Sequence, residues 1–195
     1  MSRLVPPRLR VAAAAVVAGC GGGLWLASGL KRRIWRSDPL TGVAARDRAW
    51  RHLHAELARS ARNGRVVGVA YCDVDDFKQV NDRHGHLAGD LALVTVAQCL
   101  RDAVRPSDVV ARVGGDEFVV VCGGLRSADD MEAITQRLHA TLAPAPGYLE
   151  DGNPLTGMDV TVSIGSAVGR GGDVTPGALL HAADRAMYRQ KGRQR

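Results

Sequence analysis

The strongest constraint on the fold of this 195-residue chain is a pair of short apolar runs with two adjacent glycines in the three residues between them. The first run, VVARV, covers residues 109–113, and the second, EFVVVC, covers residues 117–122. Runs rich in β-branched residues are typical of strands, and Gly114 and Gly115 between them can both adopt a positive φ. The pattern therefore predicts a β-hairpin with its turn at the two glycines, and hence an antiparallel sheet.

Helix and strand patterns alternate on both sides of this hairpin. Apolar residues recurring every three or four positions predict helices, and two further apolar runs have the composition of strands. We expect helices over residues 43–62, 87–104, 128–142 and 176–190, strands over 65–72 and 159–168, and a Pro- and Gly-rich loop over 144–157. This order, α-β-α-β-β-α-β-α, predicts an α/β fold of the α+β sandwich type, with a mostly antiparallel sheet flanked by helices.

The charge of the chain is divided unevenly along its length. Residues 1–37 hold seven of the 26 lysines and arginines and none of the 20 aspartates and glutamates, so residues 38–195 have a net charge of −1. A duplex-binding face needs a surplus of cations, which the body of the chain lacks, so we expect no nucleic-acid binding. The hydrophobic content of 46% excludes disorder as the main state.

Residues 11–30 contain no charged side chain and have arginines or lysines on both sides. Twenty residues of helix span about 30 Å, the thickness of the hydrocarbon core of a bilayer, so we expect one N-terminal transmembrane helix. Four cations follow the segment and three precede it, which favours a single-pass protein with a cytoplasmic body. Two alternatives stay open: a lipoprotein-type cleavage box at Val17–Cys20 with export of the body, and a signal peptide or peripheral segment.

Two clusters of carboxylates lie where the predicted strands end. Asp73-Val74-Asp75-Asp76 follows the strand 65–72, and Asp116-Glu117 lies at the tip of the hairpin. Because adjacent strands are about 4.8 Å apart, three or more of these carboxylates meet at one rim if the two elements are neighbours. Oxygen ligands of this kind suit Mg²⁺ beside a phosphate substrate. The alternative, a polar turn of solvated acids, stays open above all for the single residues Asp75, Asp76 and Asp82.

The hairpin sequence Arg112-Val113-Gly114-Gly115-Asp116-Glu117-Phe118 resembles the signature of the GGDEF family, the bacterial diguanylate cyclases. Four further motifs of the family occur in matching order, so the resemblance covers about residues 38–193. They are Asp38–Gly42 with Arg46, Asp73–Asp82 with Gly85-His86 and Gly89-Asp90, Thr161–Gly165, and Ala183-Asp184 with Met187-Tyr188 and Lys191. The resemblance implies a fold like the palm of nucleotide cyclases and polymerases. It covers a catalytic domain over 38–195, and the apolar segment described above makes 1–37 a membrane segment. We therefore expect the protein at the inner membrane of the cell.

The resemblance also implies a reaction, in which two GTP molecules are joined into cyclic di-GMP and two pyrophosphates are released. Each subunit of a homodimer would hold one GTP with two Mg²⁺ or Mn²⁺ ions, and the product would act as an allosteric inhibitor. By resemblance, the carboxylate of Asp73 and the carbonyl of Val74 are metal ligands. Asp116 and Glu117 complete the metal site, and one of them is the base that accepts the hydroxyl proton.

The remaining site residues are carried over from the same motifs. Asn81 and Asp90 would recognise guanine, and His86 would support the loop beside the base or simply pack there. The expected phosphate contacts come from Phe77, Lys78, Gly114, Gly115 and Lys191, with Arg195 or Arg193 as a further cation. Arg105-Pro106-Ser107-Asp108 matches the family's product-inhibition motif, so Arg105, Asp108 and Arg112 form the expected inhibitory site.

The sequence departs from the family pattern at its end, because Gly192-Arg193 follows Lys191 directly where two more residues are usual. This departure favours one alternative: a catalytically weak or inactive module that binds GTP or cyclic di-GMP as a sensor. A third possibility is a membrane-anchored scaffold that recruits a partner. Within the apolar segment, Gly19 and Gly23 form a Gly-x-x-x-Gly pair that suggests helix pairing in the membrane.

Overall fold

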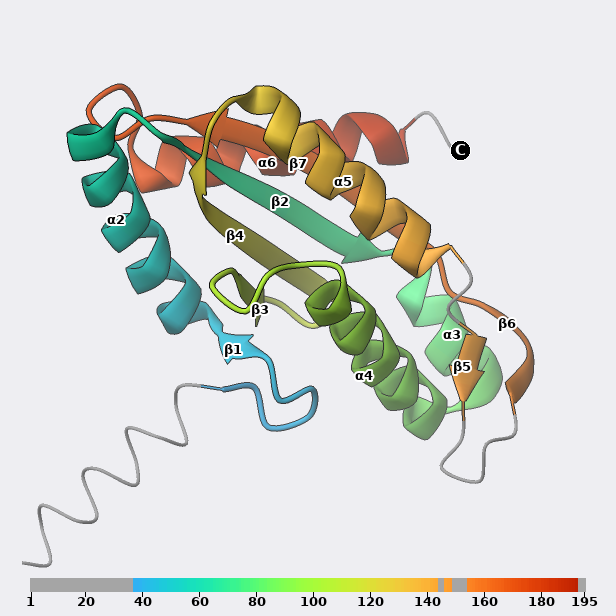
Figure 1. Cartoon of the computed structure of the whole chain (residues 1–195). Coiled ribbons are helices and arrows are strands. Elements are labelled where there is room, and N and C mark those ends of the chain that lie inside the picture. Colours follow the sequence, from blue (N-terminus) through green and yellow to red (C-terminus); the bar gives the residue numbers. More distant parts are fainter. Residues whose placement is uncertain (1–36, 144–145, 149–153, 193–195) are drawn as a thin grey trace, which may run out of the picture.

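The computed structural model describes residues 37–143, 146–148 and 154–192 of the chain. Its centre is a five-stranded sheet with the strand order β1-β3-β4-β2-β7 (Figure 1). Strand β1 pairs with β3 in parallel, and the other neighbours are antiparallel, as the sequence predicts. The strands are β1 (Ala44–Ala45), β2 (Val66–Val74), β3 (Val109–Arg112), β4 (Glu117–Leu125) and β7 (Val162–Gly169).

Helices cover both faces of this sheet, which confirms the expected α/β architecture (Figure 1). One face packs against α2 (Arg46–Asn63) and α6 (Pro176–Lys191), and the other packs against α4 (His86–Asp102) and α5 (Ala128–Leu142). A short helix, α3 (Phe77–His84), lies between β2 and α4 in the chain and packs against α4.

The central strand β2 divides its side chains between two apolar cores. Ala70 and Cys72 belong to the core with α4 and α5, whereas Val69 and Tyr71 belong to the core with α2 and α6. Successive side chains of a strand point to opposite faces, so Asp73 lies on the same face as Tyr71. The last part of β2 therefore carries a carboxylate toward the side of the sheet that α6 covers.

Several boundaries differ from those that the sequence predicts. Residues 44–45 form the edge strand β1, so the first helix begins at Arg46 instead of residue 43. The predicted helix 87–104 starts at His86 and follows a separate helix, α3, because Gly85 takes a φ of 83° between the two. The predicted loop over 144–157 contains two short paired strands, β5 (Pro146–Tyr148) and β6 (Pro154–Asp159).

The hairpin is confirmed, but its turn works differently from the expectation. Arg112 pairs with Phe118, so the connection is longer than two residues, and the N–H of Val113 donates to the carbonyl of Glu117. Neither Gly114 nor Gly115 is in the left-handed region of φ. A longer connection needs no positive φ at both central residues, so another property of these glycines matters here.

Within the part of the chain that the structure describes, no helix is both long and apolar enough to cross a bilayer. The apolar segment 11–30, for which the sequence predicts a transmembrane helix, lies outside these residues.

Candidate active site

The pairing of β2 with β4 brings the two acidic segments together at one rim of the sheet. Asp73 on β2 lies directly opposite Glu117 on β4. The N–H of Val74 donates to the carbonyl of Asp116 at 3.1 Å, which joins the hairpin turn to the end of β2. The structure thus places the four residues expected to form the metal site, Asp73, Val74, Asp116 and Glu117, next to one another.

The carboxylates at this rim repel one another. Burial raises the pKa of Asp73, and the charges of Asp116 and Asp75 raise it further, whereas the ammonium of Lys191 opposes them. Burial also raises the pKa of Glu117, with Asp73 and Asp116 adding to the effect. A concentration of negative charge in a partly buried place is an environment that favours a cation.

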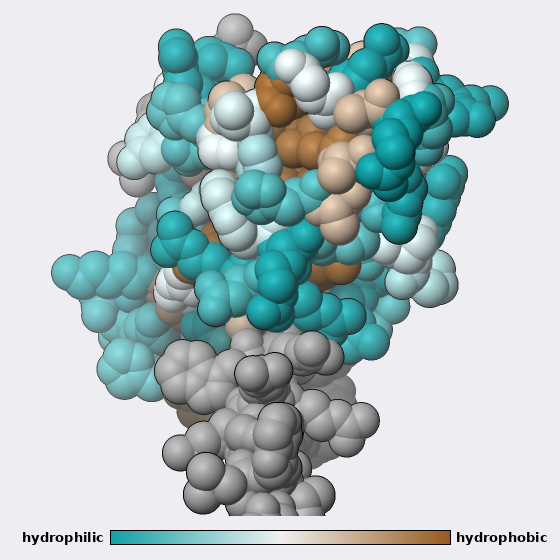
Figure 2. Space-filling model, turned by 90° about the vertical axis from the view of Figure 1, so that its left-hand side faces the viewer, coloured by the Kyte–Doolittle hydropathy of each residue, from teal (hydrophilic) through white to brown (hydrophobic). Residues whose placement is uncertain are grey.

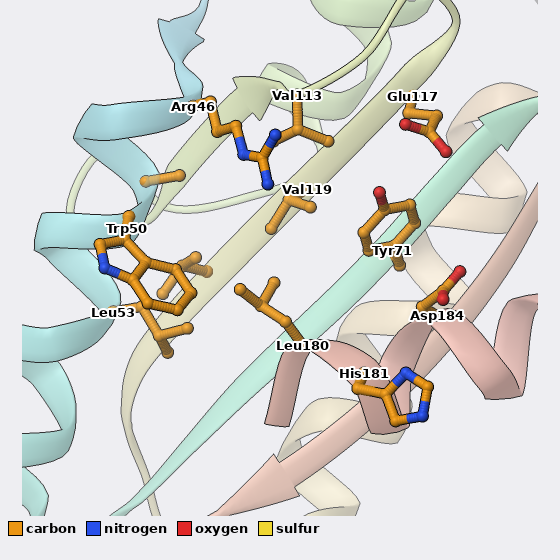
Figure 3. Close-up of a pocket in the computed structure, with 12 residues that line it drawn as sticks. Arg46, Trp50, Leu53, Tyr71, Val113, Glu117, Val119, Leu180, His181 and Asp184 are labelled. Atoms are coloured by element: carbon orange, nitrogen blue, oxygen red, sulfur yellow. The ribbon is translucent and has the colours of Figure 1, made fainter. Parts of the chain in front are cut away.

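Two of these carboxylates are held by groups of the protein itself. Asp73 forms an ion pair with Lys191 at the end of α6, and both side chains are largely covered. The hydroxyl of Tyr71 faces Glu117 in Figure 3, and its interaction with that carboxyl opposes the rise in the pKa of Glu117. Burial and the charge of Glu117 raise the pKa of Tyr71 to about 12, so this phenol is a donor at neutral pH.

Gly114 matters because of this arrangement of Glu117. A Cβ built on Gly114 would overlap Oε2 of Glu117, whereas a Cβ on Gly115 would meet nothing within 4 Å. A side chain at the first glycine of the motif would therefore displace the carboxylate that packs over it.

The donor set suits Mg²⁺ or Mn²⁺, because it offers only carboxylate and carbonyl oxygens. In the described residues, however, no three aspartate, glutamate, histidine or cysteine side chains converge as a ready metal site. Asp73 and Glu117 are turned toward Lys191 and Tyr71.

Asp75 has a structural role at the same rim. Its carboxylate accepts hydrogen bonds from the hydroxyls of Thr161 at 2.9 Å and Ser163 at 2.6 Å, and its N–H donates to the carbonyl of Thr161. These bonds fasten the segment after β2 to β7 and fix the direction in which the chain leaves the sheet.

The residues expected to contact guanine lie on α3 and α4. Asn81 belongs to α3 and Asp90 to α4, and the two helices approach closely at Gly89. A Cβ on Gly89 would overlap Oδ1 of Asn81 and would also come within 3.2 Å of the ring of Phe77. The small residue beside Asp90 therefore allows Asn81 to lie against α4. His86, the first residue of α4, is exposed.

The turn into α3 is an unusual one. Asp76 has a φ of 49°, the one positive value at a non-glycine position among the described residues. It is followed at once by Phe77 and Lys78, whose N–H groups are the first of α3. The first N–H groups of a helix have no partners within that helix and are suited to binding anions.

Arg112 lies elsewhere than the sequence suggests. Its guanidinium donates to the carbonyl of Gly115 at 3.1 and 2.6 Å and to Oδ1 of Asp38 at 3.2 Å. Asp38 in turn accepts from the N–H of Thr41 at 2.8 Å and its hydroxyl at 2.7 Å. Arg112 thus ties the start of the domain to the hairpin turn, so its side chain is not directed at Arg105 and Asp108.

Arg105 and Asp108 form a compact turn. Oδ2 of Asp108 accepts from the N–H of Arg105 at 3.1 Å, and the N–H of Asp108 donates to the carbonyl of Arg105 at 2.9 Å. The turn borders a cavity of about 420 Å³ that Arg48 and Arg101 also line. Sequence reasoning missed both of these arginines. Arg101 lies four residues before Arg105, a detectable spacing, but nothing local connects Arg48 to this place.

A second cavity, of about 360 Å³, lies between α2, α6 and the sheet. Trp50, Leu53 and Leu180 provide apolar walls, and Tyr71 and Glu117 reach it from the strands (Figure 3). Figure 2 shows apolar side chains at the bottom of a hollow on the side of the molecule that α2 occupies. Tyr71 was missed from sequence because it stands in an apolar strand and looks like a core residue.

Comparison with known proteins agrees with this geometry. A family model described as "Diguanylate cyclase, GGDEF domain" matches residues 36–195. Diguanylate cyclase DgcP of Pseudomonas aeruginosa is 40% identical over 164 residues, which are 82% of this chain and 23% of that protein. Diguanylate cyclase TpbB of the same species is 39% identical over 158 residues, which are 81% of this chain and 35% of that protein. This chain therefore spans well under two thirds of either relative.

Solved structures show the same fold. The GGDEF domain of TpbB from Pseudomonas aeruginosa superposes with a TM-score of 0.74 at 38% identity, covering 80% of this chain and 89% of that chain. The coiled coil and GGDEF domain of DgcB from Caulobacter crescentus, in complex with c-di-GMP, superposes with a TM-score of 0.78 at 26% identity and covers 89% of each chain.

Proposed function

The chain belongs to the GGDEF family of diguanylate cyclases, and we propose that it condenses two GTP molecules into cyclic di-GMP with release of two pyrophosphates. The observation that carries this proposal is the register of β2 and β4, which puts Asp73 opposite Glu117 with Asp116 beside them. A site for phosphoryl transfer needs such a group of oxygen ligands beside a place for phosphates.

Asp73, the Val74 carbonyl, Asp116 and Glu117 would hold two divalent cations for each GTP. Such cations, when bound, increase the acidity of the attacking hydroxyl and stabilise the charge of the leaving pyrophosphate. In each of two equal steps, a ribose 3′-oxygen forms a bond to an α-phosphorus while the bond from that phosphorus to the pyrophosphate oxygen breaks. Asp116 or Glu117 accepts the hydroxyl proton.

The other residues bind and orient the nucleotide. Asn81 and Asp90 contact guanine, because an amide pairs with the acceptors of the purine and a carboxylate accepts from its N1–H and exocyclic amine. The first N–H groups of α3, with Gly114 and Gly115, provide uncharged contacts for the phosphates. His86 lies beside the base, and Lys191 and Arg195 supply positive charge, although Arg195 lies outside the described residues.

Each chain holds one GTP, so the reaction needs two chains that face each other. We therefore propose a homodimer as the active form.

The turn of Arg105 and Asp108 is the proposed site at which cyclic di-GMP inhibits the enzyme, because the arginine guanidinium can form two hydrogen bonds to a phosphate and a carboxylate accepts hydrogen bonds from guanine. The sequence also assigns Arg112 to this site, and in the structure its guanidinium is bonded to Gly115 and Asp38.

The apolar segment 11–30 supports a further proposal, that the chain is a single-pass protein of the inner membrane with a cytoplasmic catalytic domain. Protease treatment of intact spheroplasts tests this orientation. Digestion of the catalytic domain from outside would exclude a cytoplasmic body.

The test of activity uses the full chain with GTP and Mg²⁺ and follows cyclic di-GMP by chromatography. The wild type should form product. The rate of Glu117→Gln should be at least a hundredfold lower, because the change removes a metal ligand and a candidate base together. Glu132→Gln, the same change at an exposed position of α5, keeps the rate. If a folded wild type binds GTP or cyclic di-GMP without forming product, the protein is a sensor instead.

A further inference from the structure

The carboxylate of Asp73 already has a cation beside it, and that cation belongs to the protein. The ammonium of Lys191 pairs with Oδ1 of Asp73, and it also feels the negative charges of Asp75 and Asp116. The ammonium is thus held by the same acidic rim that would hold a divalent cation.

Two of the expected metal ligands, Asp73 and Glu117, have neighbours within the protein. Asp73 forms an ion pair with Lys191, whereas Glu117 lies beside Tyr71 and packs over Gly114. The ligands are adjacent in the sheet, but their side chains are turned to partners within the protein. A metal ion that enters this rim must first release Asp73 from Lys191.

The place of Lys191 allows such a release. It is the last residue of α6, and its side chain is 24% exposed, against 15% for Asp73. A partly hydrated ion pair on a long, flexible side chain is separated at low cost. The triphosphate of GTP is a stronger attractor for an ammonium than one carboxylate is, since it carries several negative charges.

We propose that Lys191 is a built-in counter-ion that competes with the divalent cation for Asp73 in the empty enzyme and moves to the phosphates of GTP when the substrate arrives. This inference rests on the proposed function, because it takes Asp73 as a metal ligand and GTP as the substrate. Its consequence is a binding order: the site has a low affinity for the metal alone, and nucleotide binding frees the metal ligand.

The experiment measures two bindings separately on the full chain. Binding of Mn²⁺ without nucleotide is followed by electron paramagnetic resonance of the free ion. Binding of GTP without metal, in the presence of a chelator, is followed by calorimetry. Lys191→Ala should bind Mn²⁺ about tenfold more tightly and metal-free GTP about tenfold more weakly, since one ion pair at this partial exposure is lost in each comparison.

The opposite signs of these two effects separate competition from a structural role, because a distorted site would bind both ligands more weakly. Arg189→Ala removes a charge from an exposed position of the same helix and should change neither binding. Asp73→Asn should abolish Mn²⁺ binding and strengthen metal-free GTP binding. The gain in GTP binding should be smaller when Lys191 is already alanine, which a double-mutant cycle measures.

Unchanged or weaker Mn²⁺ binding in Lys191→Ala, in a protein where Asp73→Asn abolishes that binding, would overturn the competition and leave the proposed function intact. If Asp73→Asn does not affect Mn²⁺ binding at all, the metal site assigned in the proposed function is wrong and the inference fails with it.

Discussion

Asp38 shows how one residue at the start of the domain can set the shape of a site far along the chain. Its carboxylate accepts hydrogen bonds from Thr41 and from Arg112, and Arg112 also donates to the carbonyl of Gly115. The turn that precedes Asp116 and Glu117 is therefore held by an acid 74 residues before Arg112. This link joins sequence motifs that a linear comparison treats as separate.

Replacing Asp38 by asparagine should destabilise the domain at neutral pH by about 1–2 kcal/mol, because charge-assisted hydrogen bonds to Thr41 and Arg112 are weakened. Burial alone would raise the pKa of Asp38, but its bonds with Thr41 and Arg112 outweigh burial and lower it. Because the pKa of Asp38 is lower in the folded state, its ionised carboxylate stabilises the fold. This stabilisation is complete at a pH above the pKa in the unfolded state, about 3.9, and is lost as the pH falls through the pKa in the folded state.

Chemical denaturation at pH 7 and near pH 3 measures this dependence. The difference in the free energy of unfolding between wild type and Asp38→Asn should be smaller at the lower pH. Asp173→Asn, at an exposed turn, should differ much less from wild type in its free energy of unfolding at either pH. A constant gap across this range would mean that the charge of Asp38 does not contribute.

At the scale of elements, the contact between α3 and α4 positions the side chains that we propose to bind guanine. The two helices meet where Gly89 has no Cβ, and Asn81 fills that space. Gly89→Ala should push the amide of Asn81 away and weaken binding of GTP by about tenfold. Binding of ITP, which lacks the exocyclic amine, should fall less, since fewer base contacts are available to lose.

Calorimetry with both nucleotides measures the ratio of the two affinities. Gly177→Ala, in a helix where the added Cβ finds room, should leave the ratio at its wild-type value. An equal loss for GTP and ITP in Gly89→Ala would show that the contact supports the fold and not the recognition of guanine.

The cavity beside the Arg105 turn is also an assembly of elements, because α2 and α4 both contribute arginines to it. Arg105→Ala should raise the cyclic di-GMP concentration for half-inhibition at least tenfold while the uninhibited rate is kept. Arg112→Ala should instead lower thermal stability with little relief of inhibition, because its partners are Asp38 and Gly115. Equal relief in both variants would restore Arg112 to the inhibitory site.

Sequence patterns predicted the elements that have strong periodicity and missed those that depend on distant partners. The apolar runs around Gly114 gave the hairpin, and the helix 128–142 matches α5. The two-residue strand β1 and the short helix α3 are too brief for a periodic signal. The proximity of Asp73 and Glu117 could be predicted because both residues lie at the ends of strands expected to be neighbours. The partners of Arg112, Tyr71 and Lys191 could not, because they depend on tertiary packing.

At the scale of the whole molecule, one domain holds one set of site residues, while the proposed reaction forms two bonds between two nucleotides. If the proposed homodimer is the active form, dimer formation controls the rate at low concentration, and a membrane segment would raise the local concentration of the domain. Gly19 and Gly23 are a candidate contact between such segments. If Gly23→Leu leaves association in membranes unchanged, that contact is excluded.

A mixing experiment tests the dimer directly. It uses a total protein concentration at which the rate per chain no longer rises, so that chains are paired. Adding excess Glu117→Gln protein to a fixed amount of wild type should suppress product formation, because wild-type chains become trapped in mixed dimers with one impaired half-site. Excess Glu132→Gln should add product instead. A wild-type rate that is indifferent to the Glu117→Gln protein would mean that a single chain carries out both steps, and the two-chain site would have to be abandoned.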